Sequence, residues 1–343
     1  MSRHCAAQRR GSKKAKHRAQ CSIFSSCSRT IHGLNGTFDP NQRDTVAKVI
    51  RSMQSKATQV FLLFPVLLLA LSGPAAAAPP EKISIPTASI SNSPKSLVAY
   101  RYLPASAPPH PAVVMLHGCG GAYDKRGEIG ARHRMWGEYL ASHGFVALLV
   151  DSFTPRDTPQ ICTIKFGERT LKETDRAGDA YAALAWLRQQ PGVDAQRISV
   201  MGWSHGAGVA LQVISNAQQA DALKGGFHAA VSFYPGCTSR NKKADQFHPY
   251  APLLVLMGES DDWTPAAPCQ ALTDTLARRG EPMRIVLYPD TYHDFDNPGL
   301  SSKRVRMEVP NGVRPGEGVT VAPNAEARKD AMQRVLAFLK SPQ

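Results

Sequence analysis

The sequence lacks several features that would assign it to a class at once. From residue 79 onward it has no His-x-x-x-His or Cys-x-x-Cys pair, so a metal site has little support. We find no internal repeat. The one long apolar run, Val60 to Leu71, has about a dozen residues interrupted by Pro65, too few for a comfortable membrane span. We therefore expect no catalytic metal and no stable membrane anchor.

Positive charge is concentrated at the start of the chain. The formal charge of +14 by itself suggests a nucleic-acid partner. Residues 1–52, however, hold 11 Lys and Arg against Asp39 and Asp44, whereas residues 79–343 hold 29 against 25 acidic residues. The body has an ordinary mixed surface, and we predict no nucleic-acid partner for it.

Residues 53–78 have the layout of a secretory signal peptide. Met53 and Lys56 form a short charged start, the apolar run follows, and Ala75 to Ala78 provide small residues for cleavage. We interpret Met53 as the initiator and residues 1–52 as a non-native extension; the alternative is a genuine, disordered basic tail or a targeting extension. The pattern predicts a periplasmic or secreted protein whose mature domain covers residues 79–343.

Four cysteines remain in this mature domain, an even number that fits two disulfides in an oxidising compartment. Three pairings are possible. We favour Cys119 with Cys162 and Cys237 with Cys269, because each pair follows neighbouring predicted strands. Buried free thiols are the alternative.

Short apolar runs alternate with helical segments through the whole mature domain. Ala112 to Leu116 and Phe145 to Val150 are continuously apolar, as is typical of strands buried on both faces. Ala325 to Lys340 has the pattern of a terminal amphipathic helix. The alternation predicts an α/β fold with a mostly parallel sheet covered by helices on both faces, and ligands at the carboxyl ends of its strands.

The stretch from Val200 to Gly208 contains the motif Gly202-Trp203-Ser204-His205-Gly206. It predicts a strand, a very sharp turn with Ser204 at its apex, and the start of a helix. Glycines on both sides have no Cβ to collide with the neighbouring strand and helix. The helix N-terminus also places free N–H groups where negative charge would develop. Ser204 is therefore our candidate nucleophile.

An acid and a base follow Ser204 at the ends of two later strands. Asp261 and Asp262 follow the predicted strand Pro252 to Met257, and His293 follows the next one. Serine needs a base to take its proton and a third group to orient that base. We expect His293 to be the base and one of the two aspartates to orient it, with no metal or cofactor.

An oxyanion site is expected at the glycine-rich run His117-Gly118-Cys119-Gly120-Gly121. One backbone donor would be His205, which follows the nucleophile, and the other Cys119 or Gly120. We expect the imidazoles of His117 and His205 to be structural or pocket-wall groups.

Together these motifs resemble the dienelactone hydrolase family of α/β-hydrolases over residues 95–340. The resemblance rests on the glycine-rich run, the serine motif, Asp151-Ser152-Phe153, the loop from Gly258 to Pro265, and His293-Asp294-Phe295. It implies the α/β-hydrolase fold with about eight strands, ester or lactone hydrolysis, no cofactor, and Asp261 rather than Asp262 as the acid. The chain departs from the family pattern at Ser204, where dienelactone hydrolases proper have cysteine.

We therefore predict an exported serine hydrolase acting on a small-molecule ester or lactone. A peptidase or acyltransferase using the same triad is the alternative, and a non-catalytic binding protein is a weaker one. Trp203, Arg156 and Tyr234 are candidate substrate-binding residues. Family members that act on carboxylates have an arginine near the position of Arg156.

Overall fold

The computed structural model describes residues 79–87 and 94–341. The expected extension over 1–52 and the expected signal peptide over 53–78 lie outside the described residues. All that follows concerns the unit that begins at Pro74.

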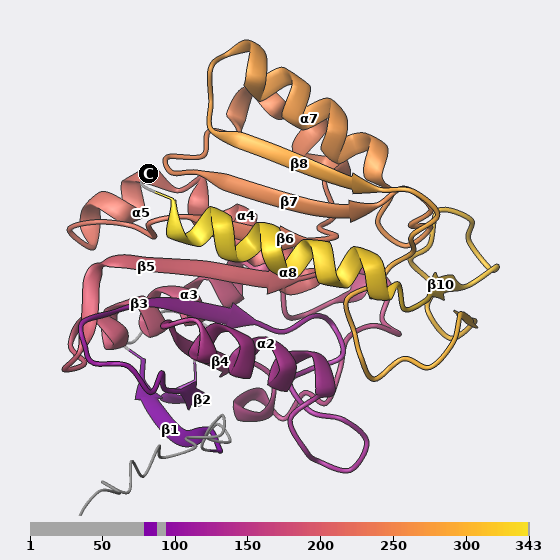
Figure 1. The fold of residues 1–343 in the computed structure, drawn as a ribbon. Coiled ribbons are helices and arrows are strands. Elements are labelled where there is room, and N and C mark those ends of the chain that lie inside the picture. The colour runs from indigo at the N-terminus through magenta and orange to yellow at the C-terminus, as the bar shows by residue number, and fades with distance from the viewer. Residues whose placement is uncertain (1–78, 88–93, 342–343) are drawn as a thin grey trace, which may run out of the picture. The chain divides into compact units, whose positions relative to one another are not determined.

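The described residues form one eight-stranded sheet in the order β1-β2-β4-β3-β5-β6-β7-β8 (Figure 1). From β4 to β8 all neighbours are parallel, and β1 and β2 add an antiparallel edge. The strands are β1 (Glu81–Pro86), β2 (Ser96–Tyr102), β3 (His110–Leu116), β4 (Val146–Asp151), β5 (Val193–Trp203), β6 (Ala230–Phe233), β7 (Leu253–Gly258) and β8 (Met283–Tyr288). This confirms the predicted mostly parallel sheet of about eight strands.

Helices cover both faces of this sheet. Figure 1 shows α2 and α8 in front of the strands and α3 and α4 behind them. Tyr139 of α2 donates a hydrogen bond to the carbonyl of Met332 in α8 (3.2 Å), which joins the two helices on their shared face. The helices are α2 (Ala131–Ser142), α3 (Glu173–Arg188), α4 (His205–Ile214), α5 (Ala217–Ala222), α6 (Thr238–Lys242), α7 (Ala266–Arg278) and α8 (Ala325–Lys340), with 3-10 turns η2 (Thr154–Arg156), η3 (Phe166–Glu168) and η4 (Ala244–Gln246).

The core lies on both sides of the central strands. Every residue of β4 and β7 is buried, as the continuous apolar runs predict. Helix α4 is buried along nearly its whole length, because it sits between the sheet and α3. Small residues follow at Gly206, Ala207 and Gly208, so its backbone can approach β3 closely. The position of the turn before α4 is therefore decided by packing at the centre of the protein.

One helix is longer than the sequence predicts. The periodic pattern predicts α7 only from Ala271, but the helix begins at Ala266. Pro268 falls in its first turn, where the missing N–H has no helical partner to lose. For the poorly periodic stretch 301–323 the sequence allows a loop or a small hairpin about Pro310-Asn311-Gly312, and the structure has a small hairpin of β9 (Arg304–Arg306) and β10 (Val319–Val321). No helix among the described residues is both long and apolar enough to cross a bilayer.

Candidate active site

Ser204 lies at a strained turn between β5 and α4. Its backbone has φ 51° and ψ −113°, a region that residues with a side chain rarely adopt. A Cβ on Gly202 would lie 2.1 Å from the carbonyl oxygen of Gly206, and a Cβ on Gly206 would lie 2.1 Å from that of Leu116. Only glycine fits at both positions. The turn holds Ser204 at the carboxyl end of β5, partly exposed.

His293 and Asp261 meet at the ends of neighbouring strands. The Nδ1 atom of His293 lies 2.7 Å from Oδ2 of Asp261, and both side chains are buried. The other carboxylate oxygen of Asp261 accepts the backbone N–H groups of Trp263 (2.9 Å) and Thr264 (2.8 Å). Those bonds fix the carboxylate, while Oδ2 binds the imidazole and also accepts the hydroxyl of Thr264 (3.1 Å). The His–Asp pair therefore has the geometry of an oriented base.

The second imidazole nitrogen of His293 is unused. Nε2 is buried and has no hydrogen-bond partner among the described residues, Ser204 included. Because Nδ1 donates to Asp261, the neutral ring has its free electron pair on Nε2. Rings of Tyr234 and Trp263 pack against the imidazole at centroid distances of 4.4 and 4.6 Å. Catalytic hydrogen bonds are often long before substrate binds, so an unpartnered Nε2 is consistent with the role of general base.

Asp262 points to a different partner. Its carboxylate accepts both the backbone N–H (2.7 Å) and the hydroxyl (2.6 Å) of Thr320 in β10. Its carbonyl accepts the N–H of Val313 (2.8 Å). The structure therefore pairs His293 with Asp261 and uses Asp262 to hold the stretch that contains the small hairpin.

The glycine-rich run after β3 lies against the Ser204 turn. A Cβ on Gly118 would lie 3.3 Å from the carbonyl oxygen of Trp203. The backbone N–H groups of Cys119 and His205 have no acceptor among the described residues. The carbonyl of Cys119 accepts from Ile161 (2.8 Å), and its sulfur is bonded to Cys162. Both predicted oxyanion donors are free to bind a ligand atom, and Cys119 is held in place from two sides.

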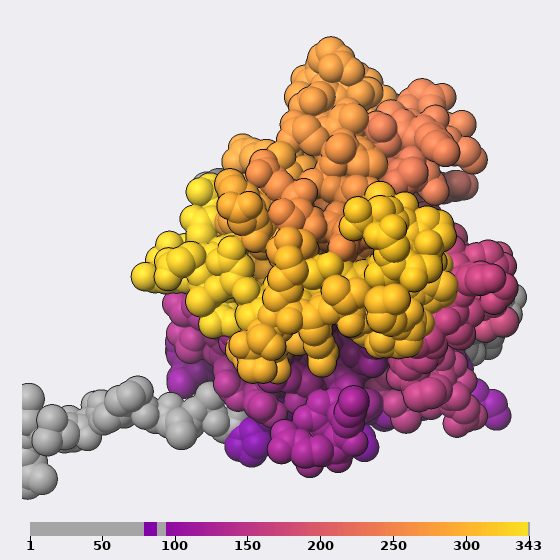
Figure 2. Space-filling view, turned by 90° about the vertical axis from the view of Figure 1, so that its right-hand side faces the viewer, coloured from indigo at the N-terminus to yellow at the C-terminus, as the bar shows by residue number. Residues whose placement is uncertain are grey.

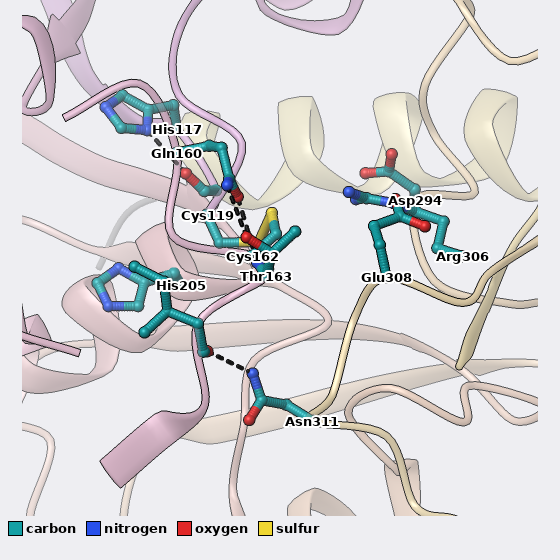
Figure 3. The surroundings of a disulfide bond; sticks show 12 residues. His117, Cys119, Gln160, Cys162, Thr163, His205, Asp294, Arg306, Glu308 and Asn311 are labelled. Atoms are coloured by element: carbon teal, nitrogen blue, oxygen red, sulfur yellow. Dashed lines mark hydrogen bonds and ion pairs between the residues drawn. A yellow bond between two sulfur atoms is a disulfide. The ribbon is translucent and has the colours of Figure 1, made fainter. Parts of the chain in front are cut away.

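Both predicted disulfides are present, Cys119–Cys162 and Cys237–Cys269. The first ties the run after β3 to the loop 154–170. In the view of Figure 3 it lies between His117 and His205 on one side and Arg306 and Glu308 on the other.

The imidazoles of His117 and His205 are hydrogen-bond acceptors. Nε2 of His117 accepts the N–H of Ser152 (3.1 Å), and Nδ1 of His205 lies 2.8 Å from the guanidinium of Arg176. Burial and the nearby Arg176 hold the pKa of both histidines well below the usual value. They are neutral and buried, in keeping with the structural role that we expect for them.

Trp203 and Tyr234 lie beneath the site and have no exposed surface. Nε1 of Trp203 donates to Asp296 (2.8 Å), and the Tyr234 hydroxyl donates to the other oxygen of the same carboxylate (2.6 Å). Trp136 adds a third hydrogen bond to Asp296 (2.8 Å). The sequence interpretation places Trp203 and Tyr234 on the substrate surface, but buried polar groups need partners and Asp296 provides them. They support the site from below.

Asp296 was missed by sequence analysis, as was its neighbour Arg132. Burial raises the pKa of Asp296 despite the charge of Arg132. Arg132 forms an ion pair with Asp294, and its guanidinium lies 5.5 Å from the ring centroid of Trp203. The position of Asp296, three residues after His293, was the one available signal.

Arg156 forms a structural ion pair with Asp179. Its two terminal nitrogens lie 2.9 and 2.8 Å from the carboxylate oxygens of Asp179 on α3, and one also donates to the carbonyl of Ser152 (2.6 Å). Asp179 is fully buried. The structure therefore directs this guanidinium toward α3, where it braces the loop 154–170.

The stretch 301–323, called here the covering segment, lies over the carboxyl ends of the strands. Figure 2 shows the part of the chain between β8 and α8, in orange to yellow, across this face. Val321 forms a bridge with His293, and Asn311 hydrogen-bonds both Phe166 (2.9 Å) and Ile164 (2.8 Å) of the loop 154–170. Apolar residues of both segments form a small second core. His293 is consequently only 1% exposed.

No group of three His, Cys, Asp or Glu side chains within 79–87 and 94–341 is arranged to hold a metal ion.

The sheet order and the sharp turn between β5 and α4 define the α/β-hydrolase fold. The chain belongs to the dienelactone hydrolase family, whose model matches residues 97–342.

Solved structures of similar fold include a putative dienelactone hydrolase from Klebsiella pneumoniae, with 20% identity, 77% of this chain and 98% of that chain covered, and a TM-score of 0.58. Esterase 2 of Thermogutta terrifontis, phosphorylated by paraoxon, has 21% identity, covers 78% and 96%, and has a TM-score of 0.53. At these identities the likeness shows the fold alone.

Curated relatives match over shorter stretches. An uncharacterised protein of Mycobacterium tuberculosis is 32% identical over 149 residues, 40% of this chain and 51% of that protein. A probable 2-oxo-3-(5-oxofuran-2-ylidene)propanoate lactonase of Bradyrhizobium is 25% identical over 163 residues, 46% of this chain and 64% of that protein. The matched stretches thus span about half to two thirds of these relatives.

Proposed function

We propose that this chain is an exported serine hydrolase that cleaves carboxylic esters or lactones. The observation that carries the proposal is the buried His293–Asp261 pair, whose unused Nε2 lies at the same carboxyl edge of the parallel strands as the strained Ser204 turn. Family membership and the naming of a Bradyrhizobium relative as a lactonase support this reaction class.

In this proposal, Ser204 attacks the ester carbonyl while His293 takes the hydroxyl proton. Asp261 stabilises the imidazolium that forms. The backbone N–H groups of Cys119 and His205 receive the oxyanion. His293 then returns the proton to the leaving alcohol, and a water molecule hydrolyses the acyl-enzyme by the same steps in reverse order.

The covering segment favours small substrates. His293 is almost fully buried and its backbone pairs with Val321 of this segment, so a folded polypeptide could not reach Nε2 unless the segment moved. A lactone or a short ester needs far less room. A small ester therefore suits the site better than a peptide amide does.

Export is part of the same proposal. Two disulfides join all four cysteines of the described residues, as expected in an oxidising compartment. The N-terminal sequence of the native protein tests this: a start near residue 79 is expected, and a peptide from residues 1–52 in cells would contradict the proposed start at Met53.

Turnover by Ser204→Ala tests the mechanism. We expect p-nitrophenyl ester and lactone hydrolysis to fall to background with an unchanged melting temperature, and a fluorophosphonate to label Ser204 of the parent alone. Matched p-nitroanilides, as amides, separate esterase from peptidase activity. A Ser204→Ala protein as active as its parent would refute the mechanism.

A further inference from the structure

A guanidinium is buried directly behind the predicted oxyanion site. Arg176, in the first turns of α3, has no exposed surface, although most arginines on amphipathic helices face solvent. It lies over the ring of Phe153, 5.1 Å from the centroid. The proposed mechanism does not use this residue, and no motif in the sequence marks it.

The two terminal nitrogens of Arg176 bind two different elements. One lies 2.8 Å from Nδ1 of His205, the residue that follows the nucleophile. The other donates to the backbone carbonyl of His117 (2.8 Å), two residues before Cys119. A single planar group thus joins the start of α4 to the run after β3. The backbone N–H groups of His205 and Cys119 are the two predicted oxyanion donors.

These two elements are already in close contact. A Cβ on Gly206 would lie 2.6 Å from the same His117 carbonyl oxygen that Arg176 binds. The atom that Arg176 binds therefore lies at the contact between the two elements. Because guanidinium is planar and rigid, it sets the distance between its two acceptors more sharply than an ammonium group could.

The charge of Arg176 has no carboxylate in direct contact within the described part of the chain. Asp179 is paired with Arg156, while Asp151 and Glu173 act on Arg176 only through space. Burial lowers the pKa of Arg176 to about 10, so it is cationic at neutral pH. Buried cations without an ion pair are costly, and this one contacts the two elements that carry the predicted oxyanion donors.

We propose that Arg176 is a positioning residue of the hydrolytic site: it sets the spacing of the two oxyanion-binding N–H groups and adds a favourable field there. This inference rests on the function proposed above. Arg176 would help to stabilise the tetrahedral oxyanion formed from an ester or lactone, rather than the substrate in its ground state.

Arg176→Lys tests the proposal, since lysine keeps the charge but lacks the two planar nitrogens that bind the two acceptors separately. We expect kcat for p-nitrophenyl esters to fall about 10- to 100-fold and KM to stay within about threefold. The affinity for a trifluoromethyl ketone, which forms a tetrahedral adduct, should fall by the same factor as kcat/KM. Methylguanidinium should restore part of the activity of Arg176→Ala.

Arg188→Lys is the matched control. Arg188 lies at the other end of α3 and also binds backbone carbonyls, those of Leu223 (3.0 Å) and Gly225 (2.8 Å). It should lose stability without loss of kcat. The inference is overturned if Arg176→Lys keeps the parental kcat and inhibitor affinity. It is also overturned if Arg176→Lys loses no more activity than Arg188→Lys. Either result would leave the proposed function standing. Absence of Ser204-dependent turnover and labelling in the parent would overturn the proposed function and the inference with it.

Discussion

Gly206→Ala offers the sharpest test of how packing positions the site. The new Cβ would lie 2.1 Å from the carbonyl oxygen of Leu116 and 2.6 Å from that of His117. Both are backbone atoms at the buried end of β3, so no side chain can turn away to make room. To relieve this clash, the start of α4 must retreat from β3 by about 1 Å.

That retreat carries the backbone N–H of His205 away from Cys119. A displacement of about 1 Å at a reacting centre costs roughly 100-fold in rate, so we expect kcat to fall by about that factor. Alanine gains about 1 kcal/mol of helix propensity, while overpacking costs about 1–3 kcal/mol. The expected net loss of stability is about 0–2 kcal/mol, or at most roughly 8 °C in melting temperature.

Gly208→Ala on the same helix is the control. Its Cβ would lie 1.9 Å from the end of the Glu173 side chain, which can rotate away at the expense of its ion pair with Arg240. We expect near-parental kcat. Ester turnover and thermal unfolding, measured on both variants, check the argument. A Gly206→Ala protein with kcat within about threefold of the parent would refute it.

Three further predictions concern the site and its support. Asp261→Asn should lower kcat about 1,000- to 10,000-fold, because His293 loses its orienting carboxylate, whereas Asp262→Asn should mainly loosen the covering segment; steady-state kinetics distinguish them. Replacing the Cys119–Cys162 pair by serines should lower unfolding stability by about 2–4 kcal/mol and also lower kcat, whereas removal of the second disulfide should affect denaturant unfolding alone. Burial and Arg132 lower the pKa of His133 to about 3. The unfolded chain therefore binds more protons than the folded chain between about pH 3 and 6.5, so stability falls as pH drops through that window. His133→Asn should reduce the slope of the free energy of unfolding against pH by up to about 1.4 kcal/mol per pH unit. An unchanged slope would contradict this.

The sequence by itself was sufficient for features that depend on local pattern and chain order. Buried strands appear as continuous apolar runs, and the Gly-x-Ser-x-Gly motif predicts a turn that only glycine neighbours permit. The carboxyl ends of parallel strands share one edge, so Asp261 and His293 could be expected near each other. The same reasoning predicted both disulfides, because each pair follows neighbouring strands.

Only the tertiary structure decided what surrounds those residues. Arg176 and Arg156 both look like surface arginines in the sequence, yet each is directed inward by an acceptor distant in the chain: His117 and His205 for Arg176, and Asp179 for Arg156. Trp203 precedes the nucleophile in sequence but lies beneath it in space, because Trp203 is the last residue of the buried strand β5 whereas Ser204 lies on the sharp turn that follows. Burial and hydrogen bonding are set by packing between segments far apart in the chain, which no local pattern records.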